Sequence, residues 1–179
     1  RRAATNIRQA ICVLGTHAVI TIALSFSLAS SLIKQSSNSH NAIDSKNFWR
    51  RSIASALACR ALGDKLGLKT PDDFLITGLF QDIGILAFDA LIPEEYEALY
   101  TTALNHDALL KFERIAFGIG HDELGYALLK QWQLPDHISM ACIASHSQSA
   151  PKEIGPAMSG CIAVSGHIAD YFLNPEENE

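Results

Sequence analysis

Basic side chains are scarce in this sequence, and charged side chains of either sign are few. The 179 residues include 14 Lys and Arg against 19 Asp and Glu, so the formal net charge is −5. This deficit argues against a nucleic-acid-binding surface, which needs an excess of positive charge. Only 18% of the residues are charged, whereas 48% are hydrophobic, which is too apolar for a disordered chain. We expect a sizeable core in one or at most two domains.

Closely spaced cysteine pairs are absent. Cys12, Cys59, Cys142 and Cys161 never form the C-x-x-C spacing that binds zinc or cycles as a dithiol. They lie in apolar stretches, so we expect buried free thiols in a cytoplasmic, reducing environment. The chain also lacks a G-x-x-x-x-G-K-[ST] loop, a G-x-S-x-G elbow and an H-E-x-x-H helix. P-loop nucleotide binding, acyl transfer and zinc proteolysis therefore have no support.

Charged residues are missing from residues 9–33, and three arginines precede this stretch. Charge alone would permit a membrane span or a signal peptide. The stretch nevertheless carries His17 and several Ser and Thr side chains, which weaken insertion. We therefore expect a buried helix and no membrane insertion. The chain begins with Arg1 rather than Met, which suggests a fragment of a longer protein.

Proline is rare, and none of the six prolines lies in the first 70 residues. Helices are the natural interpretation, because proline is the residue that most strongly breaks them. Capping residues, glycines and prolines delimit the expected helices, which are residues 5–14, 16–34, 46–66, 70–81, a helix that starts at 93, and 107–118, 121–132, 135–146 and 157–173. Neither strand-like alternation nor an internal repeat is found. We expect an all-α fold.

Residues 78–84 read G-L-F-Q-D-I-G and place an acid, Asp82, among apolar neighbours. This segment resembles the G-L-L-H-D-I-G signature of HDOD domains, a branch of the HD phosphohydrolase superfamily that does not look catalytic. Three further segments are similar to family motifs, in the right order: residues 47–52 to F-W-x-H-S, residues 117–135 to F-G-x-x-H-x-x-x-G-x-x-L-L-x-x-W-x-L-P, and residues 143–146 to I-x-x-H-H. The resemblance implies a single compact, multi-helix HD-like domain over residues 1–173 that lacks the family's first helices. An acidic linker or tail over residues 174–179 follows it.

Catalytic HD domains hold a divalent metal with a histidine, an adjacent His-Asp pair and a closing aspartate. On the resemblance, Arg51 stands at the first histidine position and Gln81 replaces the histidine of the pair. Asp82 is retained, and Asp170 matches the closing aspartate. An arginine cannot be a ligand, because its guanidinium stays cationic. We therefore expect a degenerate site with no metal, no cofactor and no catalytic residue.

Other interpretations of these residues stay open. Arg51 and Asp82 can form an ion pair that replaces the metal. His121 and His146 resemble histidines that bind additional ions in relatives, and with Asp82 they could form a weak residual site. His121 could equally be the cap of the helix that it opens.

The resemblance implies a bacterial signal-transduction domain that acts by binding a protein partner or a small ligand, or by controlling an attached output domain. Similar HDOD domains often precede a diguanylate cyclase, which would place this chain in c-di-GMP signalling. One alternative is a metal-dependent phosphohydrolase acting on nucleotides, which would need the retained carboxylates and histidines to hold an ion despite Arg51. Another alternative is a small-anion sensor in the degenerate cleft, where Arg51 would face the anion.

Overall fold

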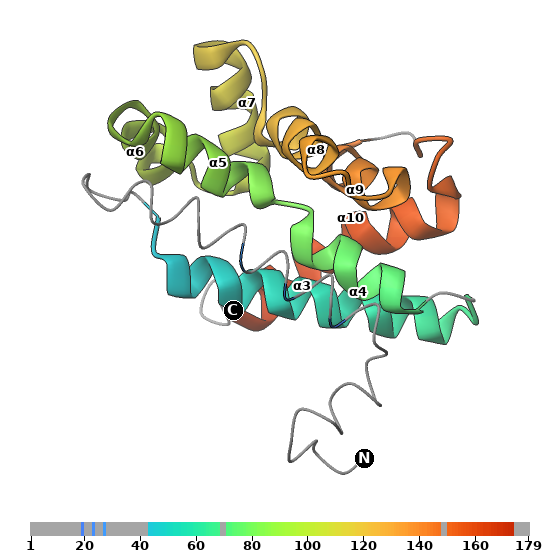
Figure 1. The fold of residues 1–179 in the computed structure, drawn as a ribbon. Coiled ribbons are helices and arrows are strands. Elements are labelled where there is room, and N and C mark those ends of the chain that lie inside the picture. The colour runs from blue at the N-terminus through green and yellow to red at the C-terminus, as the bar shows by residue number, and fades with distance from the viewer. Residues whose placement is uncertain are drawn as a thin grey trace.

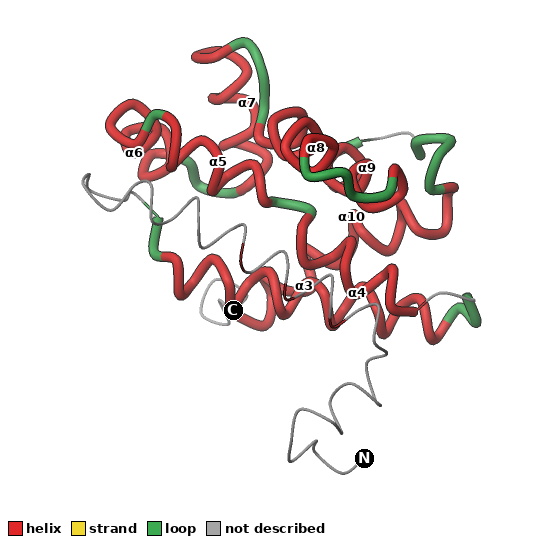
Figure 2. Tube along the Cα trace, in the orientation of Figure 1, coloured by secondary structure: helices red, strands yellow, loops and turns green. Residues whose placement is uncertain are grey.

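The computed structural model describes residues 43–68, 71–147 and 150–173, together with the single positions Val19, Ala23 and Ser27. This part of the chain is helical and contains no strand, as Figure 2 shows. The predicted all-α fold is therefore confirmed. The helices expected over residues 5–14 and 16–34, the uncharged stretch 9–33, Cys12, His17 and the tail 174–179 lie outside the described residues.

The described part of the chain forms helices α3 to α10. They are α3 (Ser45–Lys65), α4 (Pro71–Phe80), α5 (Ile83–Leu91), α6 (Pro93–Thr102), α7 (His106–Phe117), α8 (His121–Gln131), α9 (Asp136–His146) and α10 (Gly155–Leu173). Helices α3, α4 and α10 pack against one another, and α8 and α9 form a pair that contacts α4, α5 and α10 (Figure 1). Helix α9 therefore connects the α3–α4–α10 group to α8, which in turn packs on α5.

Local signals decide most helix ends. The side chain of Asp44 caps α3 by accepting a hydrogen bond of 2.9 Å from the backbone N–H of Lys46. Pro93 opens α6, with acidic residues in the first turn where the helix dipole favours them. Gly118 ends α7 with a φ of 79°, a left-handed conformation that costs glycine little.

Helix α5 is the described helix that the sequence did not predict. Every residue from 74 to 89 is buried, and α5 is apolar around its circumference except at Asp89, so it has no helical periodicity to detect. The run Asp72–Leu91 is long and apolar enough to cross a membrane by composition. A turn at Gln81 and Asp82 divides it into α4 and α5, and most of it is buried in the core.

The core also contains the thiols of Cys59, Cys142 and Cys161, which are buried and free. The predicted burial of these three cysteines is therefore confirmed. Burial raises the pKa of Cys59 to about 12, so this thiol stays protonated and unreactive at neutral pH.

Gly84 allows α5 to cross the start of α8 at very short range. A Cβ atom at this position would lie 1.9 Å from the carbonyl oxygen of His121 and 2.7 Å from the backbone nitrogen of Gly125. Neither backbone atom can move without shifting α8. The close crossing brings the α4–α5 turn next to His121.

We expect Gly84→Ala to lower the free energy of unfolding by about 3 kcal/mol or more, because the added methyl group meets backbone rather than a flexible side chain. Denaturant unfolding followed by circular dichroism measures the change. Gly160→Ala in α10 is the matched control, since its Cβ would meet nothing within 4 Å. It should raise stability by about 0.5–1 kcal/mol. Equal effects of the two substitutions would contradict the close crossing.

Candidate functional site

The Arg51 side chain of α3 lies between two carboxylates. Its Nη1 donates to Oδ2 of Asp82, which stands at the turn between α4 and α5. Its Nε and Nη2 donate to Oδ1 and Oδ2 of Asp170 on α10, at 2.6 and 3.0 Å. The predicted ion pair between Arg51 and Asp82 is confirmed, and Asp170 joins it through a bidentate contact.

Burial and the nearby positive charge have opposite effects on the pKa of Asp82. Its side chain is 4% exposed, and burial alone would raise its pKa. The Arg51 guanidinium outweighs burial and holds the pKa of Asp82 well below its usual range. Asp82 is therefore a buried carboxylate that is charged at neutral pH and neutralised by an arginine from another helix.

Gln81, at the position of the motif histidine, is buried in a hydrogen-bond network. Its Nε2 donates to the hydroxyl oxygen of Ser55 at 2.8 Å, and its Oε1 accepts from the hydroxyl of Ser165 at 3.2 Å. Ser55 and Ser165 lie on α3 and α10, and their hydroxyl oxygens are 3.2 Å apart. The amide therefore ties together three elements, and both of its polar atoms have protein partners.

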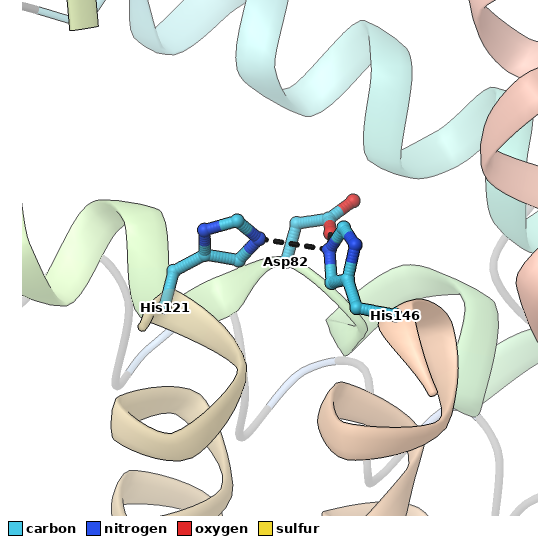
Figure 3. A group of neighbouring side chains, drawn as sticks. All are labelled: Asp82, His121 and His146. Carbon is cyan, nitrogen blue, oxygen red and sulfur yellow. Dashed lines mark hydrogen bonds and ion pairs between the residues drawn. The ribbon is translucent and has the colours of Figure 1, made fainter. Parts of the chain in front are cut away.

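His121 and His146 meet beside Asp82. Figure 3 shows the two imidazoles converging from the start of α8 and the end of α9, with Asp82 between them at the α4–α5 turn. The two Nε2 atoms are 2.9 Å apart, and Nε2 of His146 lies 3.8 Å from Oδ1 of Asp82. The ligand atoms of the three residues lie within 4.8 Å of one another.

Glu113 orients His121, and sequence reasoning missed it. This fully buried carboxylate of α7 accepts hydrogen bonds from the backbone N–H of His121 at 2.6 Å and from the hydroxyl of Tyr96 at 2.6 Å. It also lies 2.7 Å from Nδ1 of His121. Because a carboxylate accepts, the proton of His121 belongs on Nδ1, and Nε2 presents its lone pair toward His146. No motif connects Glu113 to His121, so only the packing of α7 on α8 reveals the pair.

His106 is a second residue that sequence reasoning did not place at the site. Its ring centroid is 6.2 Å from that of His121, and it lines the small cavity beside Asp82 and Arg51. Burial and the nearby Arg51 charge lower the pKa of His106 to about 4. Burial alone would also lower the pKa of His146, but the carboxylate of Asp82 outweighs it and raises that pKa.

A divalent ion does not fit the Arg51, Gln81, Asp82 and Asp170 set. The guanidinium already occupies the space between the two carboxylates, and the amide of Gln81 is held by two serine hydroxyls. Asp82, His121 and His146 do bring three ligand atoms together. The two Nε2 atoms are 2.9 Å apart and share a proton in a hydrogen bond, so an ion could bind both nitrogens only by displacing that proton.

Comparisons with known proteins agree with the arrangement of these helices. Residues 1–148 match the family model of the HDOD domain. The MmoQ response regulator from Methylococcus capsulatus strain Bath is 30% identical, with a TM-score of 0.64, and the match covers 97% of this chain and 67% of that chain. This chain therefore belongs to the HDOD family.

Two more distant structures share the fold. An HDOD domain protein with unknown function from Geobacter sulfurreducens is 20% identical, with a TM-score of 0.69 and coverage of 93% of this chain and 55% of that chain. A Shewanella amazonensis protein whose description proposes a phosphohydrolase is 19% identical, with a TM-score of 0.71 and coverage of 96% and 61%. The chain thus spans between about half and two thirds of the length of these structures. None of the curated proteins matches it.

We expect Arg51→Met to lower the free energy of unfolding by about 3–5 kcal/mol, because Asp82 would be left buried and unpaired. The double variant Arg51→Met/Asp82→Asn should be more stable than Arg51→Met, since it removes the unpaired charge. Urea unfolding at pH 7 measures both. Arg60→Met is the control on the same helix, because its ion pair with Asp72 is longer, at 3.6 Å, and more exposed. A change of at most about 1 kcal/mol is expected there, and a similar change for Arg51→Met would contradict the buried pair.

The pKa values of His106 and His146 should be shifted in opposite directions from the ordinary value near 6.5. NMR of labelled imidazoles should give a pKa of about 4 for His106 and a value above 6.5 for His146. A raised folded-state pKa stabilises the fold below the unfolded value, and this stabilisation is lost as the pH rises through the folded value. His146→Gln should therefore flatten the decline in stability above pH 6.5. A His146 pKa at or below 6.5 would contradict the contact with Asp82.

Proposed function

We propose that this chain is a non-catalytic HDOD regulatory domain that acts by binding. The observation that carries the proposal is the Arg51 guanidinium, which bridges Asp82 and Asp170, the two carboxylates that on the motif resemblance match metal ligands of catalytic HD domains. A guanidinium neutralises carboxylates as a metal ion does, but it has no open coordination position and cannot lower the pKa of a bound water. The similarity to a response regulator supports a regulatory role.

A metal-dependent phosphohydrolase is the second candidate, and the cluster of Asp82, His121 and His146 favours it. Three ligands with one open position would suffice for a hydrolytic ion. Two features weigh against this candidate. The charge of Asp82 is already neutralised by Arg51, and the two imidazoles are hydrogen-bonded to each other.

The second part of the proposal concerns the domain or protein that this domain regulates. We propose that the domain controls an attached domain, such as a diguanylate cyclase of c-di-GMP signalling, or a separate protein partner in a bacterial cytoplasm. Helix α10 would transmit the signal, because it carries Asp170 of the site and exposes Tyr171 and Phe172 near its end, with 60% and 72% of these residues accessible. The native reading frame beyond Glu179 tests whether an output domain is attached. A stop codon near that position would refute the attached output domain.

The purified protein should contain no stoichiometric divalent metal and should not hydrolyse a phosphodiester such as bis(p-nitrophenyl) phosphate. Elemental analysis after purification without chelator measures the metal, and assays with added manganese, iron or zinc test hydrolysis. Asp82→Ala and His121→Ala serve as matched variants. About one equivalent of metal that is lost in both variants would favour the phosphohydrolase.

A further inference from the structure

A larger cavity lies on the outer side of Arg51. It is an open cleft with a volume of about 590 Å³, lined by the first turns of α3, the connection between α6 and α7, and the C-terminal end of α10. This volume lies within the range of small-molecule binding sites. The smaller cavity at Asp82 and His146, of about 160 Å³, shares Arg51, His106 and Asp170 with it. The larger cavity is therefore the one with room for a ligand next to the site.

The wall of this cavity is apolar at depth and polar at its rim. Phe48, Ile85 and Leu109 are at most 7% exposed and line its inner part. Asn47 and Asn105 are exposed and add carboxamide groups. Such a wall suits a ligand that buries an apolar body and keeps a polar group near the entrance.

The two arginines of the wall differ in their partners. Arg51 holds both Asp82 and Asp170, whereas Arg50 is exposed and its guanidinium has no ion-pair partner among the residues that the structure describes. A ligand with an anionic group would supply it.

The two carboxylates on Arg51 are held unequally. The Asp82 side chain is 4% exposed, but that of Asp170 is 39% exposed. Water reaches the Asp170 carboxylate and can hydrate it when it leaves Arg51, whereas a buried charge must keep its partner. An anion entering the cavity would therefore exchange with Asp170 and leave Asp82 in place.

We propose that this cavity binds a small organic anion, with an apolar body and one carboxylate, sulfonate or phosphate group, that takes the place of Asp170 on Arg51 and is held also by Arg50. This inference rests on the proposed binding function and gives that function a site and a ligand class. Asp170 and Leu173 lie in the last turn of α10 and both line the cavity. Displacement of Asp170 by the anion releases this turn from α3, which links occupancy of the cavity to the chain beyond α10.

A pair of fluorescent probes tests the site. Anilinonaphthalene sulfonate carries an apolar aromatic body and one sulfonate, and phenylnaphthylamine has a similar body without the charge. Arg50→Gln should lower the affinity for the sulfonate probe by about two- to five-fold and leave the affinity for the neutral probe unchanged. Arg60→Gln, on the same helix but outside the cavity wall, is the matched control and should change neither.

Asp170→Asn tests the exchange itself. If Asp170 competes with the ligand for Arg51, removal of its charge should raise the affinity for the sulfonate probe by about two- to five-fold. If Asp170 only supports the fold, the variant should bind more weakly or equally. Hydrogen exchange of the last turn of α10 should become faster in the wild-type protein when the probe saturates it. Near-ultraviolet circular dichroism establishes that each variant is folded.

Equal binding of the sulfonate probe by Arg50→Gln, Arg60→Gln and the wild type would overturn the anion site. Equal or weaker binding of the sulfonate probe by Asp170→Asn would overturn the exchange. Either result leaves the proposed non-catalytic function standing, because metal content and hydrolysis test that function separately. Conversely, a protein that proves to contain metal and to hydrolyse phosphodiesters would refute the proposed function whatever the probes show.

Discussion

The buried charge of Asp82 is the constraint on which the rest of the site depends. This carboxylate stands at the turn that divides the buried α4–α5 run, where its side chain is only 4% exposed to water. A cation must therefore come from another part of the chain, and Arg51 of α3 provides it. Because Arg51 also binds Asp170, 119 residues later in the sequence, the same side chain links α3 to the α4–α5 turn and to the end of α10.

A covalently attached cation has consequences that a metal ion does not have. A metal can leave, it can bind water, and its affinity varies with pH and supply. A guanidinium stays charged, offers only hydrogen-bond donors and binds no water as a nucleophile. At this site the charge of Asp82 is therefore balanced by a group of the chain itself.

A second polar cluster extends from the same turn. Glu113 receives hydrogen bonds from Tyr96 and from the backbone of His121, and the His121 ring continues the chain to His146. These contacts join α6, α7, α8 and α9 through groups that are almost all buried. A buried hydrogen-bond network lowers stability when any of its polar groups lacks a partner. A network in which every group is satisfied therefore permits few alternative packings. The parts of the site that remain open to solvent are Asp170 and the wall around Arg50.

The sequence by itself determined the fold class and most helices, because proline, glycine and capping residues act within one turn of the backbone. The resemblance to HDOD motifs also predicted a degenerate site at Arg51, Gln81, Asp82 and Asp170, since these residues match motif positions. Helix α5 escaped prediction because a helix buried on every face has no periodic pattern. Glu113 and His106 escaped because their partners lie on other helices and no motif links them. Only the tertiary structure decided which carboxylates share Arg51, how His121 is oriented and where a cavity lies, because these depend on distances between segments that are far apart in the chain.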